Sequence, residues 1–131
     1  MILVDTSVLI DFLKGNQNPQ TKKLRQIISN NIPFGITSLI MQEVLQGVKD
    51  ESEFNKVEKY LTSLEFYHPK DQINSFTAAA KIYFDLRRKG VTIRSTIDCL
   101  IVQIALENNL ALLHNDNDYK KIITFVHVNT V

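Results

Sequence analysis

The chain alternates short apolar runs with longer amphipathic segments, and this alternation restricts its fold more than any other feature. A buried strand appears as a short continuous apolar run, whereas an amphipathic helix repeats apolar residues every three or four positions. We expect strands at 2–4, 33–37, 66–68, 110–113 and 125–128. We expect helices at 7–14, from 18 onward, at 38–48, 51–64, 71–89 and 96–107, and just after a turn at 115–118.

Strands that alternate with helices pair in parallel, and the helices then cover both faces of the sheet. The expected fold is therefore α/β, with three α/β/α layers around a central, mostly parallel sheet. The length of 131 residues leaves room for one such unit, because a typical domain holds about 150 residues. We predict a single domain over 1–131.

Composition and charge exclude several classes of protein. The chain is 44% hydrophobic and 22% charged, which is typical of a globular domain and unlike a disordered or fibrous chain. Its 15 Lys and Arg residues against 14 Asp and Glu residues give a net charge of +1. Binding to nucleic acid would therefore require a local basic patch.

The cysteine content and the N-terminal residues predict where in the cell the protein acts. Cys99 is the only cysteine, so no internal disulfide can form and a reducing cytoplasm is expected. No apolar run approaches the roughly 18 residues that a membrane span needs, and the first residues lack the basic start of a signal peptide. We expect a cytoplasmic protein with no membrane partner.

Four acidic residues occupy unusual places in this pattern. Asp5 ends the first strand and Asp116 follows the strand at 110–113, so a parallel sheet would bring both to the same edge. Glu43 and Asp98 lie within helices rich in Leu, Ile and Val. Carboxylates in apolar surroundings are costly unless another group compensates them.

Each acid taken singly also has a structural explanation. Asp5 could cap the helix that follows it. Asp98 follows Ser95 at the spacing of a capping box. Asp116 could be an ordinary turn residue, and Glu43 could point to solvent from the edge of the apolar stripe. The structural roles explain the acids one by one but do not explain why four of them would gather.

Several carboxylates at one edge repel one another, so either their pKa values rise or a divalent cation lies among them. Hard oxygen ligands without nearby His or Cys favour Mg²⁺ or Mn²⁺ over zinc. The three histidines show no metal-ligand spacing, and we interpret His114, which precedes the turn, as structural.

The order of these motifs resembles the PIN-domain family of nucleases, and within it the VapC-like toxins of toxin–antitoxin pairs. The segments that carry the resemblance are ILVDTSVLI at 2–10, SLIMQEVLQG at 38–47, LRRKG at 86–90, IDCLIVQIA at 97–105 and LALLHNDNDY at 110–119. The resemblance covers nearly the whole chain. One departure is the pair His114 and Asn115, where many relatives have Thr-Arg.

The resemblance implies hydrolysis of RNA phosphodiesters that depends on Mg²⁺ or Mn²⁺. Carried onto this sequence, the catalytic and metal-binding residues are Asp5, Glu43, Asp98 and Asp116. The fourth position is the most variable in the family, so Asp118 stays open as the rival of Asp116. Accessory hydroxyl contacts are expected from Thr6 or Ser7, at least one of which is better explained as a helix cap.

A basic group precedes the third acid and is the candidate RNA-binding patch. Arg87, Arg88, Lys89 and Arg94 lie on either side of Gly90 and could position a phosphate backbone beside a metal. A solvated helix end, where cations interact favourably with the helix dipole, explains these residues about equally well.

The resemblance also implies partners. Such toxins are usually homodimers that a small antitoxin protein neutralises. The competing hypothesis is a catalytically inactive module of the same fold that binds RNA or protein. The presence of all four acids favours the enzyme.

Overall fold

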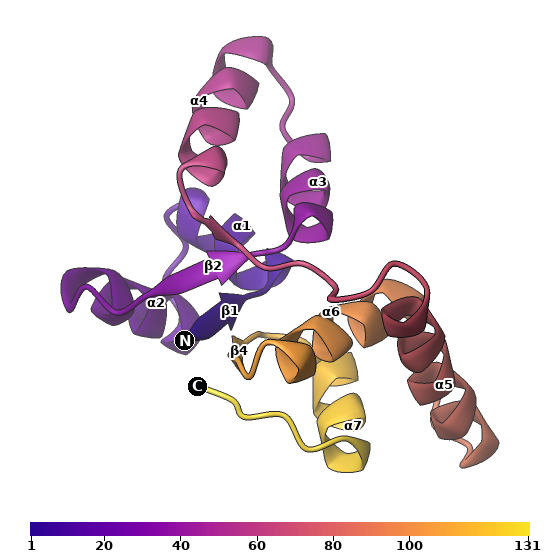
Figure 1. Ribbon diagram of the computed structural model, residues 1–131. Coiled ribbons are helices and arrows are strands. Elements are labelled where there is room, and N and C mark those ends of the chain that lie inside the picture. Colours follow the sequence, from indigo (N-terminus) through magenta and orange to yellow (C-terminus); the bar gives the residue numbers. More distant parts are fainter.

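Four parallel strands form the centre of the computed structural model, which describes residues 1–131. Their order is β3-β2-β1-β4, so the N-terminal strand lies inside the sheet (Figure 1). The strands are β1 (Ile2–Val4), β2 (Phe34–Ile36), β3 (Glu65–Phe66) and β4 (Ala111–Leu113). The α/β class with a parallel sheet is confirmed.

Seven helices connect and cover these strands. They are α1 (Thr6–Leu13), α2 (Pro19–Ser29), α3 (Ser38–Gln46), α4 (Glu51–Thr62), α5 (Asn74–Arg88), α6 (Thr96–Glu107) and α7 (Asn117–Phe125). None of them is long and apolar enough to cross a membrane. Helix α6 is buried along most of its length, including Leu100, Ile101 and Ile104, as its almost wholly apolar sequence predicts.

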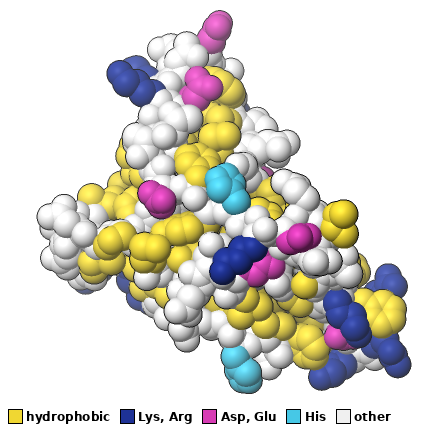
Figure 2. Space-filling view, in the orientation of Figure 1, with side chains coloured by type: hydrophobic (Ala, Val, Ile, Leu, Met, Phe, Trp, Pro, Cys, Tyr) yellow, Lys and Arg dark blue, Asp and Glu magenta, His cyan; other side chains and the backbone are white.

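The helices form two groups. Helix α1 packs against α2 and α3 on one side, whereas α6 packs against α5 and α7 on the other. The pair α3–α4 and the far end of α5 project from the sheet as separate lobes (Figures 1 and 2). The strand order explains this division, because right-handed crossovers that run in opposite directions along a sheet place their helices on opposite faces.

Capping residues explain where several helices begin. Asn18 and Thr21 form a reciprocal capping box ahead of α2, with Pro19 in its first turn. Helix α3 is capped by Thr37, whose hydroxyl accepts from the Ile40 amide at 3.1 Å. Since Thr37 is buried and Ser38 exposed, the helix starts against the sheet.

One glycine is required by the packing of neighbouring strands. Gly35 lies in β2, opposite Glu65 of β3. A Cβ atom at Gly35 would collide with the Glu65 carbonyl oxygen and the Tyr67 ring. The close approach of β2 and β3 therefore depends on the missing side chain.

The C-terminal strand expected at 125–128 is wrong. Helix α7 continues to Phe125, and the Val126 amide still donates to the Ile122 carbonyl. The chain reaches the sheet only at Thr130, through a single parallel bridge to Leu112. The apolar run has the composition of a strand, but its first residue, Phe125, ends α7. Its last residue, Val128, is apolar because it packs into the core.

Candidate active site

Asp5 is held at the carboxyl end of β1 as both a helix cap and a buried acid. Its side chain accepts from the Ser7 amide at 3.4 Å and the Ser7 hydroxyl at 3.1 Å. The Tyr119 hydroxyl donates to its other oxygen, Oδ1, at 2.8 Å. Burial raises the pKa of the Asp5 carboxyl, and these hydrogen bonds only partly oppose the rise. The capping role is therefore real, but it does not relieve the cost of burying the charge.

Glu43 of α3 and Asp98 of α6 lie close enough to Asp5 to feel its charge. Burial and the Asp5 charge raise the pKa of Glu43. Burial and the charges of Asp5, Asp116 and Glu43 raise the pKa of Asp98 to about 7. The fold thus brings all four predicted acids to one region at the carboxyl ends of β1 and β4.

Asp98 does not have the structural role that its spacing allows. Ser95 caps α6 by accepting from the Ile97 amide at 3.3 Å. Asp98 makes no return hydrogen bond to Ser95, so the capping box is incomplete. Its carboxylate lies in the first turn of α6, within range of the charges of Asp5, Asp116 and Glu43.

Tyr119 is a site residue that the sequence analysis missed. It is almost fully buried, and burial together with the Asp5 and Asp98 charges raises its pKa well above the usual value. The phenol therefore stays protonated and donates to Asp5. The available signal was the aromatic after Asp116 and Asp118, but nothing local assigns it a partner more than a hundred positions away.

Asp118 and Asp116 have different environments, although both begin α7. Asp118 is buried and accepts from the Arg94 amide at 2.9 Å and from Arg94 Nε at 3.1 Å. Lys121 Nζ lies 3.7 Å from its other oxygen. These contacts, led by the Arg94 amide, lower the pKa of Asp118.

Asp116 caps α7 by accepting from the Asp118 amide at 2.8 Å, and Arg94 Nη2 lies 3.3 Å from the same oxygen. Its second oxygen has no protein partner. Because Arg94 and Lys121 contact both oxygens of Asp118, Asp116 has the carboxylate better placed to join Asp5 and Asp98.

His114 supports this turn from inside. Its Nδ1 accepts from the Asp116 amide at 3.3 Å, and its ring lies 5.2 Å from that of Tyr119. Burial lowers the pKa of His114, so the neutral ring accepts this hydrogen bond at neutral pH. The contacts agree with the structural role expected for this residue.

The basic residues predicted to bind RNA are divided between two places. Arg94 lies beside the acids and bridges Asp116 and Asp118. Arg87 and Arg88 stack on aromatic rings of α5, and Lys89 stacks on Phe125 at the other end of α7. The expected patch next to the metal is thus reduced to one residue.

The site matches a divalent cation in its donor chemistry. The available ligands are carboxylate oxygens, which suit Mg²⁺ or Mn²⁺. No three acids, histidines or cysteines lie in an arrangement that could hold a metal ion in this structure. Three of the four acids have raised pKa values, first because they are buried and, for Glu43 and Asp98, also because other carboxylates lie near them.

The Thr6 hydroxyl is a further polar group at this site that makes no hydrogen bond. It is buried next to Asp5 and has no hydrogen-bond partner. It lies near enough to Glu43 to oppose slightly the rise of that pKa, although no well-formed hydrogen bond joins the two. A buried unpaired hydroxyl at a cluster of acids fits a site that is completed by a bound group.

Comparison with known proteins identifies the family of this chain. The profile of the PIN domain family matches residues 2–123, nearly the whole chain. The chain belongs to the PIN-domain family. The match leaves out only Met1 and residues 124–131. All four acids and Tyr119 therefore lie within the PIN domain.

Curated relatives and solved structures extend the comparison. Ribonuclease VapC11 of Mycobacterium tuberculosis (strain ATCC 25618 / H37Rv) is 31% identical over 123 residues, which cover 93% of this chain and 91% of the relative. VapC ribonuclease Mb1587 of Mycobacterium bovis has the same identity and coverage.

Among solved structures, VapBC2 from Rickettsia felis bound to a promoter DNA fragment has a TM-score of 0.76 at 19% identity. The match covers 100% of this chain and 98% of the chain in that structure. VapBC-1 from nontypeable Haemophilus influenzae has a TM-score of 0.73 at 18% identity, covering 100% and 97%. At these identities the structures support the fold of the PIN domain.

Proposed function

We propose that this PIN-domain protein is an endoribonuclease that depends on Mg²⁺ or Mn²⁺ and serves as the toxin of a toxin–antitoxin pair. The observation that carries the proposal is the convergence of Asp5, Glu43, Asp98 and Asp116 from four separate elements. The 31% identity to proteins named ribonucleases supports RNA as the substrate class.

The residues divide the chemistry between them. Asp5 and Asp98 would hold the metal ion directly, and Glu43 and Asp116 would complete the site or orient the attacking water. When bound, a divalent ion lowers the pKa of a coordinated water and offsets charge on the attacked phosphate. The Tyr119 hydroxyl donates to Asp5 Oδ1 and so fixes the orientation of this carboxylate.

Arg94 has a position suited to the substrate as well as to the acids. Its side chain is 75% exposed even though it contacts Asp116 and Asp118. An Arg at the edge of the acid cluster could turn one guanidinium nitrogen toward a phosphate while its Nε stays on Asp118. This arrangement would retain the RNA-binding role predicted for Arg94.

The proposed partners follow from the relatives. The solved structures with this fold include complexes named VapBC and one titled a toxin–antitoxin complex, from Klebsiella pneumoniae. We infer that a small antitoxin protein binds this chain, that the chain forms a homodimer and that both act in the cytoplasm. Co-expression with the adjacent small open reading frame, followed by size-exclusion chromatography with light scattering, tests both associations.

The central test is cleavage of a mixed pool of cellular RNA by the purified protein with Mg²⁺ or Mn²⁺. We expect cutting that EDTA and the variants Asp5→Asn and Asp98→Asn abolish, since each variant removes one predicted ligand. If the wild type and both variants behave alike, the acids are not catalytic and the chain is an inactive module that binds RNA or protein.

A further inference from the structure

The far end of α5 carries a concentration of cations that the acid cluster does not use. Lys81, Arg87, Arg88 and Lys89 lie within nine residues that contain a single acid, Asp85. This segment is more positive than the whole chain, whose net charge is +1. Figure 2 shows Lys and Arg side chains gathered around an exposed hydrophobic side chain at this end of the molecule.

The exposed aromatic ring in this cluster is Phe84. It is 44% exposed, with Lys81 Nζ 5.2 Å and Arg88 Cζ 5.6 Å from the centre of its ring. A favourable helix dipole explains cations in a last helical turn. It does not explain why a large apolar ring stays in solvent among them.

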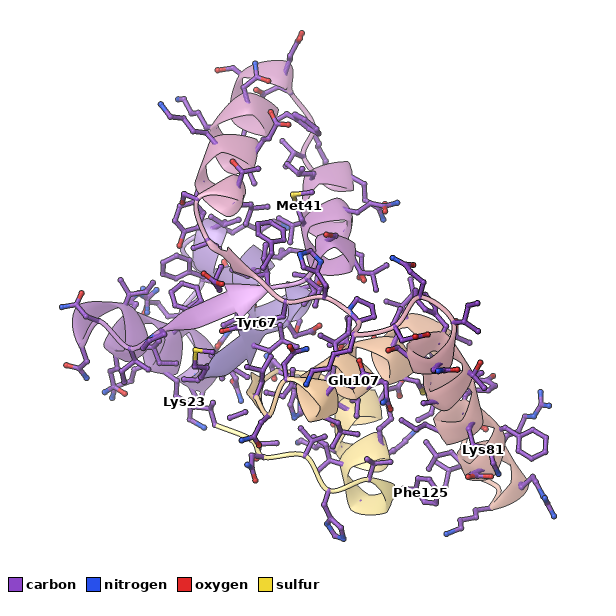
Figure 3. The ribbon with its side chains drawn as sticks, in the orientation of Figure 1. Lys23, Met41, Tyr67, Lys81, Glu107 and Phe125 are labelled. Carbon is purple, nitrogen blue, oxygen red and sulfur yellow. The ribbon has the colours of Figure 1, made fainter.

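A hollow lies between the end of α5 and the end of α7, and Arg88 contacts both the Phe84 ring and this hollow. Asp85, Arg88, Lys89 and Phe125 line it, and its volume is about 450 Å³. Figure 3 shows Phe125 extending from α7 toward the helix that carries Lys81, and Lys89 Nζ lies 4.5 Å from the Phe125 ring. Cations, aromatic rings and a hollow of this volume together match the chemistry of a nucleotide.

We propose that this hollow and the Phe84 ring bind single-stranded RNA, with one phosphate against Arg88 and Lys89 and one base stacked on Phe84. The inference rests on the proposed ribonuclease function. An exposed cation is held only weakly over an aromatic ring, whereas a base stacks on the ring with its whole face. A base would therefore displace a cation from the ring, and the displaced cation would be free to bind a phosphate.

Helix α7 sets the distance between this RNA-binding surface and the acid cluster. Its N-terminus follows Asp116, and its C-terminus is Phe125. Nine residues at about 1.5 Å each give a separation of ~13 Å. A strand held on the hollow would span that distance with a few nucleotides, so its next phosphates would reach Arg94 and the acids. The surface would therefore favour RNAs long enough to contact both places.

The test is the affinity for RNA of full-length protein that cannot cut it. Labelled single-stranded RNAs, a dodecamer and a tetramer, are titrated in EDTA against the Asp98→Asn protein, and binding is followed by fluorescence anisotropy. Adding Phe84→Ala should weaken dodecamer binding roughly tenfold. Adding Arg88→Gln with Lys89→Gln should also lower the salt dependence by about 0.7 per lost phosphate contact.

Matched controls exist in the same molecule. Phe76 lies on α5 with 45% exposure but has no cation over its ring, so Phe76→Ala removes an exposed ring alone. Lys56→Gln with Lys59→Gln removes two exposed cations from α4. Both control variants should leave the dodecamer affinity and its salt dependence within twofold of the parent protein. Circular dichroism verifies that every variant is folded.

The outcomes separate this proposal from the ribonuclease proposal. If Phe84→Ala and the double variant bind the dodecamer as tightly as the controls, the RNA-binding surface is refuted, whether or not the wild type cuts RNA. If poly-glutamate binds the surface in place of RNA and the variants lose that binding, the hollow serves an acidic protein and the proposal is also overturned. Absence of cleavage by the wild type would count against the ribonuclease while leaving the affinity comparison intact.

Discussion

The two ends of α7 show opposite ways of handling charge. Near its N-terminus, buried or half-buried acids from the end of β1, from α3 and from α6 lie close to one another. The loop that carries Arg94 supplies a cation and an amide to this region. At its C-terminus the cations are exposed and rest on rings a few positions away or on Phe125.

This difference predicts where substitutions have large effects. Buried charges interact strongly because little water screens them, and their geometry is set by the packed core. Exposed cations are screened and can rearrange, so each contributes little to stability. Changes at the acid end should therefore alter activity and stability, whereas changes at the basic end should alter only the binding of a charged partner.

The largest effect should come from the acids themselves. Asp5→Asn or Asp98→Asn should reduce RNA cleavage by more than about 100-fold, because loss of even an outer-shell group costs a metal site about 10- to 100-fold. The protein should remain folded, since the change removes a repelling charge. Cleavage assays and binding of Mn²⁺ by electron paramagnetic resonance measure the two expectations, and Mn²⁺ binding that stays as tight as in the wild type would contradict the assignment.

Tyr119→Phe should have the next largest effect. It removes the hydrogen bond to Asp5 Oδ1 and leaves a buried carboxylate oxygen without that donor. We expect about a tenfold loss of activity and a decrease of about 1–3 kcal/mol in the free energy of unfolding. Urea denaturation and cleavage kinetics provide the measurements, with Tyr83→Phe as a control on a half-exposed tyrosine of α5.

Removal of the Asp118 carboxylate tests the connection between the Arg94 loop and α7. Asp118→Ala leaves the Arg94 amide and Nε without their acceptor, so the free energy of unfolding should fall by roughly 1–3 kcal/mol. Asp118→Asn, which keeps an acceptor oxygen, should lose less. Equal losses for the two variants in urea denaturation would show that charge alone matters.

The raised pKa of Asp98 predicts a pH dependence in EDTA. Burial and the neighbouring carboxylates raise the pKa of this group in the folded chain to about 7 from its ordinary value of 3.8. Between those values the unfolded chain has lost the proton and the folded chain keeps it, so this group's contribution to stability decreases as pH rises. The difference in melting temperature between the wild type and Asp98→Asn should therefore grow in favour of the variant from pH 4 to 7. A constant difference would show that Asp98 is not perturbed.

The smallest effect should come from the basic end. Lys81 and Asp85 form an exposed ion pair on α5, and such pairs contribute up to about 1 kcal/mol, with helical pairs near 0.3–0.5 kcal/mol. Lys81→Gln should change the free energy of unfolding by less than about 0.5 kcal/mol. A loss as large as that of Asp118→Ala would contradict the contrast between the two ends.

Much of the fold was predictable from local patterns. The strands β1, β2 and β4 and the helices α1 to α6 occur close to their expected positions, because apolar periodicity depends on neighbouring residues only. The C-terminal strand was not predictable in this way. The run from Phe125 to Val128 has the composition of a strand, and only its contacts with α7 and the core decide otherwise.

The acids of the candidate site were predictable, but the residues that hydrogen-bond or ion-pair with them were not. The motif resemblance picked out Asp5, Glu43, Asp98 and Asp116 by residue type and order. It did not separate Asp116 from Asp118, because both have the same side chain two positions apart. The difference lies in the Arg94 and Lys121 contacts, which give Asp118 a lowered pKa and occupy its oxygens.

Local patterning and residue type were enough to predict the parallel α/β fold, most strands and helices in their order, and four acids near the carboxyl edge of the sheet. Only the tertiary structure decided that Tyr119 holds Asp5 and that Arg94 lies on Asp118. It also decided that Lys89 rests on Phe125, away from the acids. The physical reason is that each of these contacts joins segments distant in the chain, and their meeting depends on how the helices pack on both faces of the sheet.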